Sequence, residues 1–240
     1  MRFIIFISVL LLLTGCGSRA LQSAYSATKK ASYNTIVDYG TLIPAVGATL
    51  LYATNSDARL TKYFMENEFI EIDYDDLYRT INGYETYLTG LFIEDDTYLV
   101  KVERAVVEFT AFKVGVFIGD TLNHNIDKTS PNGANYAIGS QHAIGPFSGA
   151  AMTRRNVQQL HISPLSRYAL NTLSYSMAIA SAITRVEDGG HTAADQLVSA
   201  TVGNMVGIFF NDLFLLKGSP ATLMTSITTD SAYLDLTYRY

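Results

Sequence analysis

The chain has little cysteine and little positive charge, and each shortage excludes a class of protein. Cys16 is the only cysteine among 240 residues, so no disulfide can form within the chain. The formal net charge is −5, whereas a nucleic-acid-binding surface needs a basic excess. The sequence also lacks internal repeats and low-complexity tracts. We therefore expect a fold held by its core, with no nucleic-acid partner, metal or cofactor.

The first fifteen residues have the pattern of an export signal. Arg2 carries a positive charge, and residues 3–13 form an apolar run too short to span a bilayer comfortably. The string Leu13-Thr14-Gly15-Cys16 resembles the lipobox of bacterial lipoproteins, in which the chain is cleaved before a diacylated cysteine. The resemblance implies a membrane anchor at Cys16 and a place in the cell envelope, on the outer membrane facing the periplasm in a Gram-negative cell. An ordinary secretory signal, or a buried apolar helix in a cytosolic chain, would leave the lipobox unexplained.

After cleavage, the remaining length fits one domain with a substantial core. Residues 16–34 are rich in small and polar side chains and predict a lipidated tether, so the domain occupies residues 35–240. Residues 35–54 are nearly all apolar or small, which fits a buried helix or a marginal membrane span. Asp38 within this segment favours the buried helix.

Hydrophobic periodicity predicts a mostly helical domain. The clearest run is 97–122, where Leu99, Val102 and Phe109 belong to an apolar face with charged residues between them. Residues 60–71, 166–185 and 191–216 are further predicted helices, whereas 73–96 is ambiguous and 123–147 has the proline and glycine content of a long functional loop. Alternation over 223–240 predicts a hairpin. The predicted fold is an all-α helical bundle with a short C-terminal β-hairpin.

Arg185, His191 and Asp195 stand at fixed gaps between two predicted helices. This string resembles the last of three signature motifs of the type 2 phosphatidic acid phosphatase and vanadium haloperoxidase superfamily, with Thr184 where the superfamily usually has serine. The resemblance implies a helical bundle of the acid phosphatase type, in which His191 becomes phosphorylated, Asp195 orients it and Arg185 binds phosphate. The spacing predicts that His191 and Asp195 lie one helical turn apart on one face, so that the carboxylate can hold the imidazole.

The two other motifs of the superfamily match incompletely. The middle one, Pro-Ser-Gly-His, corresponds to Ser148-Gly149 with Ala150 in place of the histidine that protonates the leaving group. Ser148 and Gly149 are expected to open a helix and bind phosphate there. The first one, lysine followed after six residues by Arg-Pro, corresponds to Asn123 and Ser130-Pro131, without either cation.

These losses predict a divergent envelope lipoprotein with an impaired phosphate site and a binding or structural role. The alternative is an active phosphatase that hydrolyses phosphate monoesters or lipid phosphates through a phosphohistidine at His191. Candidate replacements for the lost groups are Lys128, His124, His142, Arg154 and Arg155, although Arg154 and Arg155 are more typical of a solvated surface. A third possibility is a structural lipoprotein unrelated to phosphatases. Vanadate-dependent halide oxidation is disfavoured because it relies on the same lost cations.

Overall fold

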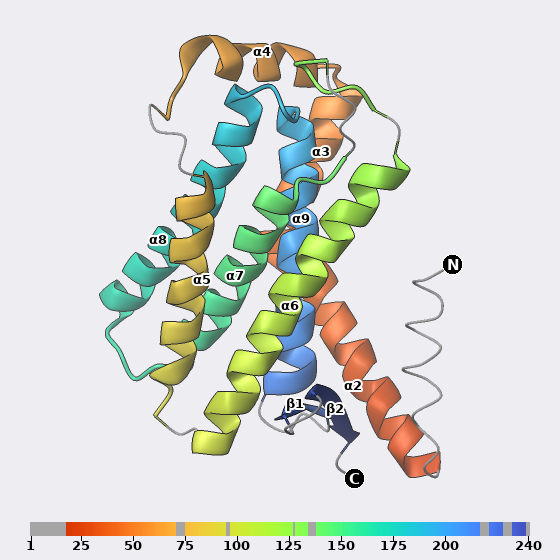
Figure 1. Cartoon of the computed structure of the whole chain (residues 1–240), viewed down its shortest axis with the longest axis vertical. Coiled ribbons are helices and arrows are strands. Elements are labelled where there is room, and N and C mark those ends of the chain that lie inside the picture. The colour runs from red at the N-terminus through yellow and green to blue at the C-terminus, as the bar shows by residue number, and fades with distance from the viewer. Residues whose placement is uncertain are drawn as a thin grey trace.

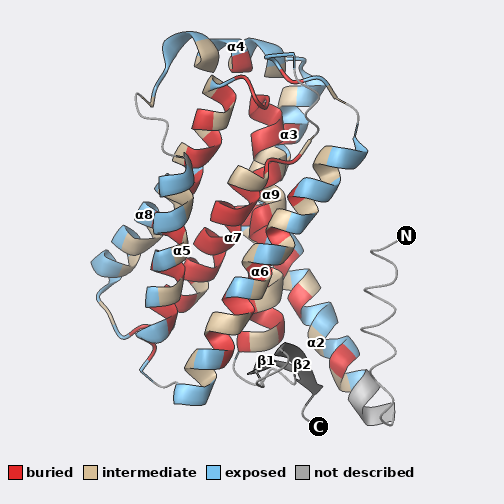
Figure 2. Cartoon of the chain, in the orientation of Figure 1, coloured by how far each residue is buried: buried red, intermediate tan, exposed pale blue. Residues whose placement is uncertain are grey.

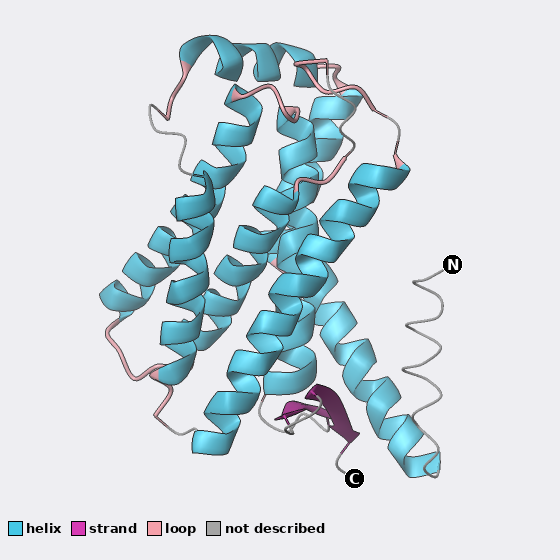
Figure 3. Ribbon diagram, in the orientation of Figure 1, coloured by secondary structure: helices cyan, strands magenta, loops and turns pink. Residues whose placement is uncertain are grey.

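The fold was analysed in a computed structural model that describes residues 18–70, 75–94, 97–126, 128–133, 138–216, 221–227 and 232–238. The predicted signal peptide and the predicted lipidation site Cys16 therefore lie outside the described residues. Within the described parts the chain is all-α in class, with one small sheet near the C-terminus (Figure 3). The elements are, in chain order, α2 (Ser18–Val37), α3 (Tyr39–Ala53), α4 (Asp57–Asn67), α5 (Asp75–Leu91), α6 (Tyr98–Asn125), α7 (Gln141–Val157), α8 (Pro164–Glu187), α9 (Ala193–Phe210), the π-helical turn η1 (Asn211–Leu215), β1 (Ala221–Ile227) and β2 (Ala232–Tyr238).

Helix α7 is the centre of the bundle. It packs against α5, α6, α8 and α9, and α4 lies across one end of these helices (Figure 1). Almost every residue of α7 is buried, as Figure 2 shows by colour. Helices α7 and α9 approach closely because α9 has glycines at the contact: a side chain at Gly203 or Gly207 would collide with the backbone oxygens of Ile144 and Ser148. The order of these contacts makes α7 and α9 run parallel.

The segment predicted as a tether is a helix from Ser18 onward, which corrects that prediction. Helix α2 packs against α9 and η1 and buries Ala24, Ala31 and Thr35. These buried residues are small, so the helix has no apolar stripe to reveal it in the sequence. Residues 22–37 therefore belong to the packed domain.

The apolar helix predicted over 35–54 is divided at Asp38. This residue is the N-cap of α3, where its Oδ1 accepts a hydrogen bond from Gly40 N at 2.8 Å. The two parts, Gln22–Val37 and Tyr39–Ala53, have membrane-span composition only as a pair bent by 52°. Ala193–Leu215 is also long and apolar enough to cross a bilayer, but more than half of its most apolar stretch is buried in the bundle. Its position as a core helix accounts for that composition.

Helix α6 confirms the long helix predicted over 97–122, but the predicted core face is wrong. Leu99 and Phe109 are more than half exposed, whereas the charged Arg104 and Glu108 are buried. Arg104 donates to Asn156 Oδ1 at 3.0 Å, and Asn156 donates in turn to Glu108 Oε1 at 2.7 Å. These bonds give Arg104 and one oxygen of Glu108 a partner, and burial raises the pKa of Glu108 to about 8, so its carboxyl is largely uncharged at neutral pH. The polar face of α6 is therefore the inner one.

The bounds of α5 and of the loop between α6 and α7 differ from the predicted ones. Helix α5 continues through Asn82-Gly83, because Asn82 is buried and donates to the backbone oxygen of Ser174 at 3.0 Å. The loop predicted over 123–147 is shorter, since α6 reaches Asn125 and α7 begins at Gln141. Strands β1 and β2 pair antiparallel, with Ala221 opposite Tyr238.

Candidate functional site

His191 lies in the turn between α8 and α9. The N-cap of α9 is Thr192, whose hydroxyl accepts from Asp195 N at 3.2 Å while Asp195 Oδ2 accepts from Thr192 N at 3.1 Å. His191 therefore precedes the helix, and its backbone N donates to the oxygen of Arg185 at 3.1 Å. The expectation that His191 and Asp195 share one helical face is wrong. The reciprocal cap still places the carboxylate beside the turn that holds His191.

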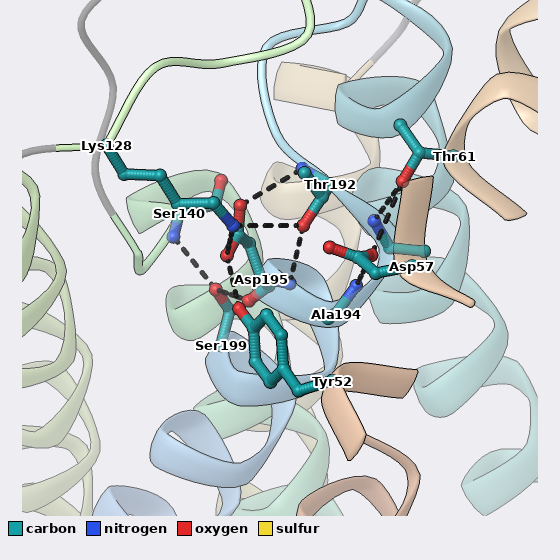
Figure 4. Close-up of polar contacts among 10 residues, drawn as sticks. Tyr52, Asp57, Thr61, Lys128, Ser140, Thr192, Ala194, Asp195 and Ser199 are labelled. Atoms are coloured by element: carbon teal, nitrogen blue, oxygen red, sulfur yellow. Dashed lines mark hydrogen bonds and ion pairs between the residues drawn. The ribbon is translucent and has the colours of Figure 1, made fainter. Parts of the chain in front are cut away.

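The carboxylate of Asp195 is buried and has partners from two other parts of the chain (Figure 4). Its Oδ1 accepts from Lys128 Nζ at 2.7 Å and from the Tyr52 hydroxyl at 2.8 Å. Burial and this carboxylate raise the pKa of Tyr52, so the phenol stays a donor. Ser199 Oγ donates to the backbone oxygen of Asp195 and accepts from Ser140 N, each at 2.8 Å. These bonds join the start of α7 to the first turn of α9.

The first amides of α9 are occupied by residues of α4. Ala193 N donates to Thr61 Oγ1 at 2.9 Å, and Ala194 N donates to Asp57 Oδ1 at 2.8 Å (Figure 4). A carboxylate at a helix N-terminus is favourable because the helix dipole is positive there. Asp57 thus takes the place that an anionic ligand would have on α9, and a bound phosphate must be held elsewhere.

Burial lowers the pKa of the His191 imidazole to about 4. Asp195 opposes the shift, whereas Arg185, His142 and Lys128 add to it by charge repulsion. Lys128 pairs with Asp195, whose carboxylate accepts from Thr192 N next to His191, and His191 N donates to the backbone oxygen of Arg185. We call His191, Asp195, Arg185, Lys128 and His142, whose charge also acts on the imidazole, the His191 site. At neutral pH the imidazole is uncharged, which is the nucleophilic form.

Arg185 reaches the His191 site from the last turn of α8. Its guanidinium pairs with Asp188 at 3.1 Å and lies beside Gly190, where an added Cβ would be 3.1 Å from Nη2. The adjoining loop, predicted to contain the first motif, packs on the same turn, since Asn132 N donates to Gly189 O at 3.0 Å. This packing brings Lys128 to Asp195.

Ser148 and Gly149 do not belong to the His191 site, which corrects their predicted role in phosphate binding. They lie two turns inside α7 rather than at its start. Ser148 packs between Gly203 and Gly207, eight to twelve residues along α9 from Asp195, so it is roughly 12 to 18 Å away along the helix axis. Gly149 O accepts from Thr86 on α5 at 3.1 Å. Both residues serve helix packing.

The middle motif was expected at the start of a helix, and the residues at the start of α7 are Ser140 and His142. Ser140 is the N-cap of α7, after Gly139 with a φ of +105°, and His142 follows in the first turn. Pro146 has no N–H for the oxygen of His142, and Ser181 Oγ donates to that oxygen at 2.8 Å instead. Ser140 Oγ is buried without a hydrogen-bond partner among the described residues. Sequence reasoning named His142 as a candidate replacement but missed Ser140; the glycine before Ser140 was the available signal.

The remaining candidate replacements lie elsewhere. His124 is on the exposed side of α6, where it contacts Asp120 at 3.4 Å. Arg154 is buried and pairs with Asp38 at 2.6 Å, so its expected surface position is wrong. Arg155 pairs with Asp212 at 3.2 Å, also below the surface. Only Lys128 and His142 of the five candidates reach the His191 site.

Among the described residues, no three histidine, cysteine, aspartate or glutamate side chains are grouped to hold a metal ion. The cations and imidazoles of the His191 site suit an anionic ligand instead. No protein-family model, curated protein or solved structure matches the chain.

Proposed function

We propose that the chain is a phosphatase that transfers a phosphoryl group from a phosphate monoester to His191 and then to water. The observation that carries the proposal is a buried imidazole, with its pKa lowered to about 4, clustered with Arg185, Lys128 and His142. Such an imidazole is neutral at physiological pH, and the nearby cations can bind the phosphate that it attacks.

Each step has a residue suited to it. A ring nitrogen of His191 attacks phosphorus, the ester P–O bond breaks, and His142 donates a proton to the leaving oxygen. Water then attacks the phosphohistidine, His142 takes a proton from it, and the N–P bond breaks to release phosphate. Arg185 and Lys128 neutralise charge on the transferred group. In this scheme His142, in the first turn of α7, takes the role of proton donor that the superfamily histidine has at the position of Ala150.

A second candidate is a phosphate-binding protein without turnover, because both cations of the site are shared with carboxylates and neutralise a transferring phosphoryl group poorly. Lys128 is paired with Asp195 at 2.7 Å, and Arg185 is paired with Asp188 at 3.1 Å. A phosphate must compete with both carboxylates. The superfamily motifs provide three cations where this site has two, and each lost charge-assisted contact removes about 1.5 to 3 kcal/mol. Turnover by the proposed phosphatase is therefore slow.

We further propose that the enzyme is an envelope lipoprotein anchored through Cys16, with a helical bundle of the acid phosphatase type. The sequence support for the anchor is the charged start, short apolar run and lipobox. The support for the bundle type is the placement of the Arg185, His191 and Asp195 string between two helices.

The test is hydrolysis of an aryl phosphate by the full chain in nonionic detergent, with wild type beside His191→Ala. His124→Ala is the matched control, because that histidine is exposed on α6. We expect the first substitution to abolish turnover and acid-labile protein phosphorylation, and the second to leave both unchanged. Phosphate binding without any hydrolysis would establish the second candidate. Equal hydrolysis by wild type and His191→Ala would refute the phosphatase.

A further inference from the structure

An apolar groove lies between α5 and α8, at the end of the bundle opposite the His191 site. Its volume is about 620 Å³, and its walls include Ile81, Tyr84, Glu85, Leu88, Leu170 and Leu173. Leu160 and His161, which follow α7, close one end. Because the His191 site is at the start of α7, the length of that helix separates the two by roughly 24 Å. The α5/α8 groove is therefore a separate feature.

One wall of the α5/α8 groove contains a buried carboxyl group. Glu85 is only 8% exposed, and neither of its oxygens has a hydrogen-bond partner among the described residues. Burial raises its pKa to about 7, and the Ser174 hydroxyl opposes this shift. That hydroxyl accepts from Asn82 Nδ2 at 3.0 Å and does not reach hydrogen-bond geometry with Glu85. A buried carboxyl without a partner is costly, and a donor from a ligand would relieve the cost.

The charges of the α5/α8 groove all favour a cation. Its described lining contains two carboxyl groups, Glu85 and Glu94, one imidazole, His161, which pairs with Glu94, and neither lysine nor arginine. Glu94 contacts His161 at 3.3 Å and is 71% exposed, which leaves Glu85 as the more buried acidic group. A phosphate, a fatty-acid anion or a lipid phosphate would meet repulsion here, whereas an ammonium group would form a charge-assisted hydrogen bond.

We propose that the α5/α8 groove binds an apolar ammonium compound, with its hydrocarbon part against Leu88, Leu170 and Leu173 and its N–H donors on Glu85. The volume admits a molecule of drug-like size or a short alkyl chain. The site is independent of phosphate chemistry at His191.

Binding of 4-phenylbutylammonium to the full chain in nonionic detergent tests the proposal, with 4-phenylbutanol and 4-phenylbutyrate as uncharged and anionic analogues. Calorimetry should show that the ammonium compound binds about tenfold to a hundredfold more tightly than the alcohol, as expected for a charge-assisted bond. The carboxylate should not bind. This series needs no variant, so a folding defect cannot obscure it.

Two substitutions locate the ammonium group. Glu85→Gln should lower the affinity for the ammonium compound to that for the alcohol, while Glu94→Gln should change it less than about twofold. Unchanged alcohol binding in Glu85→Gln shows that the groove remains intact. Equal binding of all three compounds, no binding of the ammonium compound, or a larger effect of Glu94→Gln would each overturn the proposal.

Discussion

Two ion pairs in this bundle each join a basic side chain to a buried aspartate but differ in their exposure to solvent. In the His191 site, Lys128 pairs with Asp195 at 2.7 Å; in the middle of the bundle, Arg154 pairs with Asp38 at 2.6 Å. The Lys128 side chain is 26% exposed, whereas that of Arg154 is 2% exposed. One cation can exchange its partner for a ligand, and the other cannot. Access to solvent therefore separates the ion pair of the proposed functional site from a structural one.

The residues that surround Arg154 and Asp38 also indicate a structural role for this ion pair. Asp38 is also the N-cap of α3, Arg155 lies 3.7 Å from it, and Asp212 accepts from Asn34 Nδ2 at 2.8 Å. Arg154 additionally stacks over the Tyr39 ring, 4.4 Å from its centroid. These contacts tie α2, α3, α7 and η1 together. The His191 site instead joins α3, the loop after α6, α7 and α9 through Asp195 and Ser199, beside a buried imidazole.

Removing Asp38 should have the largest effect on stability. Asp38→Ala leaves the Arg154 guanidinium buried without its carboxylate and removes the cap of α3, so the free energy of unfolding should fall by about 3 to 5 kcal/mol. Lys128→Met should cost less, about 1 to 2 kcal/mol, because Lys128 is partly solvated and the buried Asp195 carboxylate keeps its bonds from the Tyr52 hydroxyl and Thr192 N. Urea unfolding of both variants measures the difference. Similar losses in the two would contradict the division between structural and functional ion pairs.

The sequence predicted much of the helical framework but not which faces turn inward. Periodicity found α6, α8 and α9 because each has a long, largely apolar stretch without an interior proline. It failed for the inner face of α6, since Arg104 and Glu108 are buried through bonds to Asn156, a residue 48 positions or more away. Such partners are tertiary and leave no local pattern.

The candidate site was predictable where its residues are close in sequence. Arg185, His191 and Asp195 lie within one turn region and were found together. Ser148 was misplaced because a local Ser-Gly match says nothing about where α7 begins. That start is determined by Gly139 and by the bond from Ser140 N to Ser199 on α9.

His142 provides the next largest effect if it is the proton donor. His142→Ala should slow hydrolysis of alkyl phosphates by about a hundredfold to ten-thousandfold, because an alkoxide is a poor leaving group without a proton. Aryl phosphates, whose leaving groups are stable anions, should lose much less. Steady-state rates with the two substrate classes give the comparison. An equal loss for both would assign His142 to positioning instead of proton transfer.

The lowered pKa of His191 predicts a loss of stability in acid. Between about pH 6.5 and 4 the unfolded chain binds a proton that the folded chain does not, so the free energy of unfolding falls as the pH decreases, by on the order of 3 kcal/mol. Burial raises the pKa of Glu108 to about 8 and acts in the opposite direction. The difference between wild type and His191→Gln isolates the histidine. Parallel pH profiles for the two would contradict the shift.

The smallest expected effect is the loss of an N-cap hydroxyl, which can be compared at the starts of α8 and α9. Thr192 caps α9 and Ser163 caps α8, where its hydroxyl accepts from Ser166 N at 3.1 Å. Alanine at either position should cost about 1 kcal/mol of unfolding free energy, the usual value for a lost cap. Only Thr192 also borders the His191 site, since Lys128 Nζ donates to its hydroxyl at 3.3 Å.

Thr192→Ala should therefore lower hydrolysis severalfold beyond its effect on the folded fraction, because the turn that holds His191 loses one of its two reciprocal bonds. Ser163→Ala should leave the rate per folded molecule unchanged. Thr192→Ser keeps the hydroxyl and should restore both rate and stability. If both alanine variants lose activity only in proportion to stability, the cap of α9 stabilises the helix without positioning His191, and the comparison between the two helix starts fails.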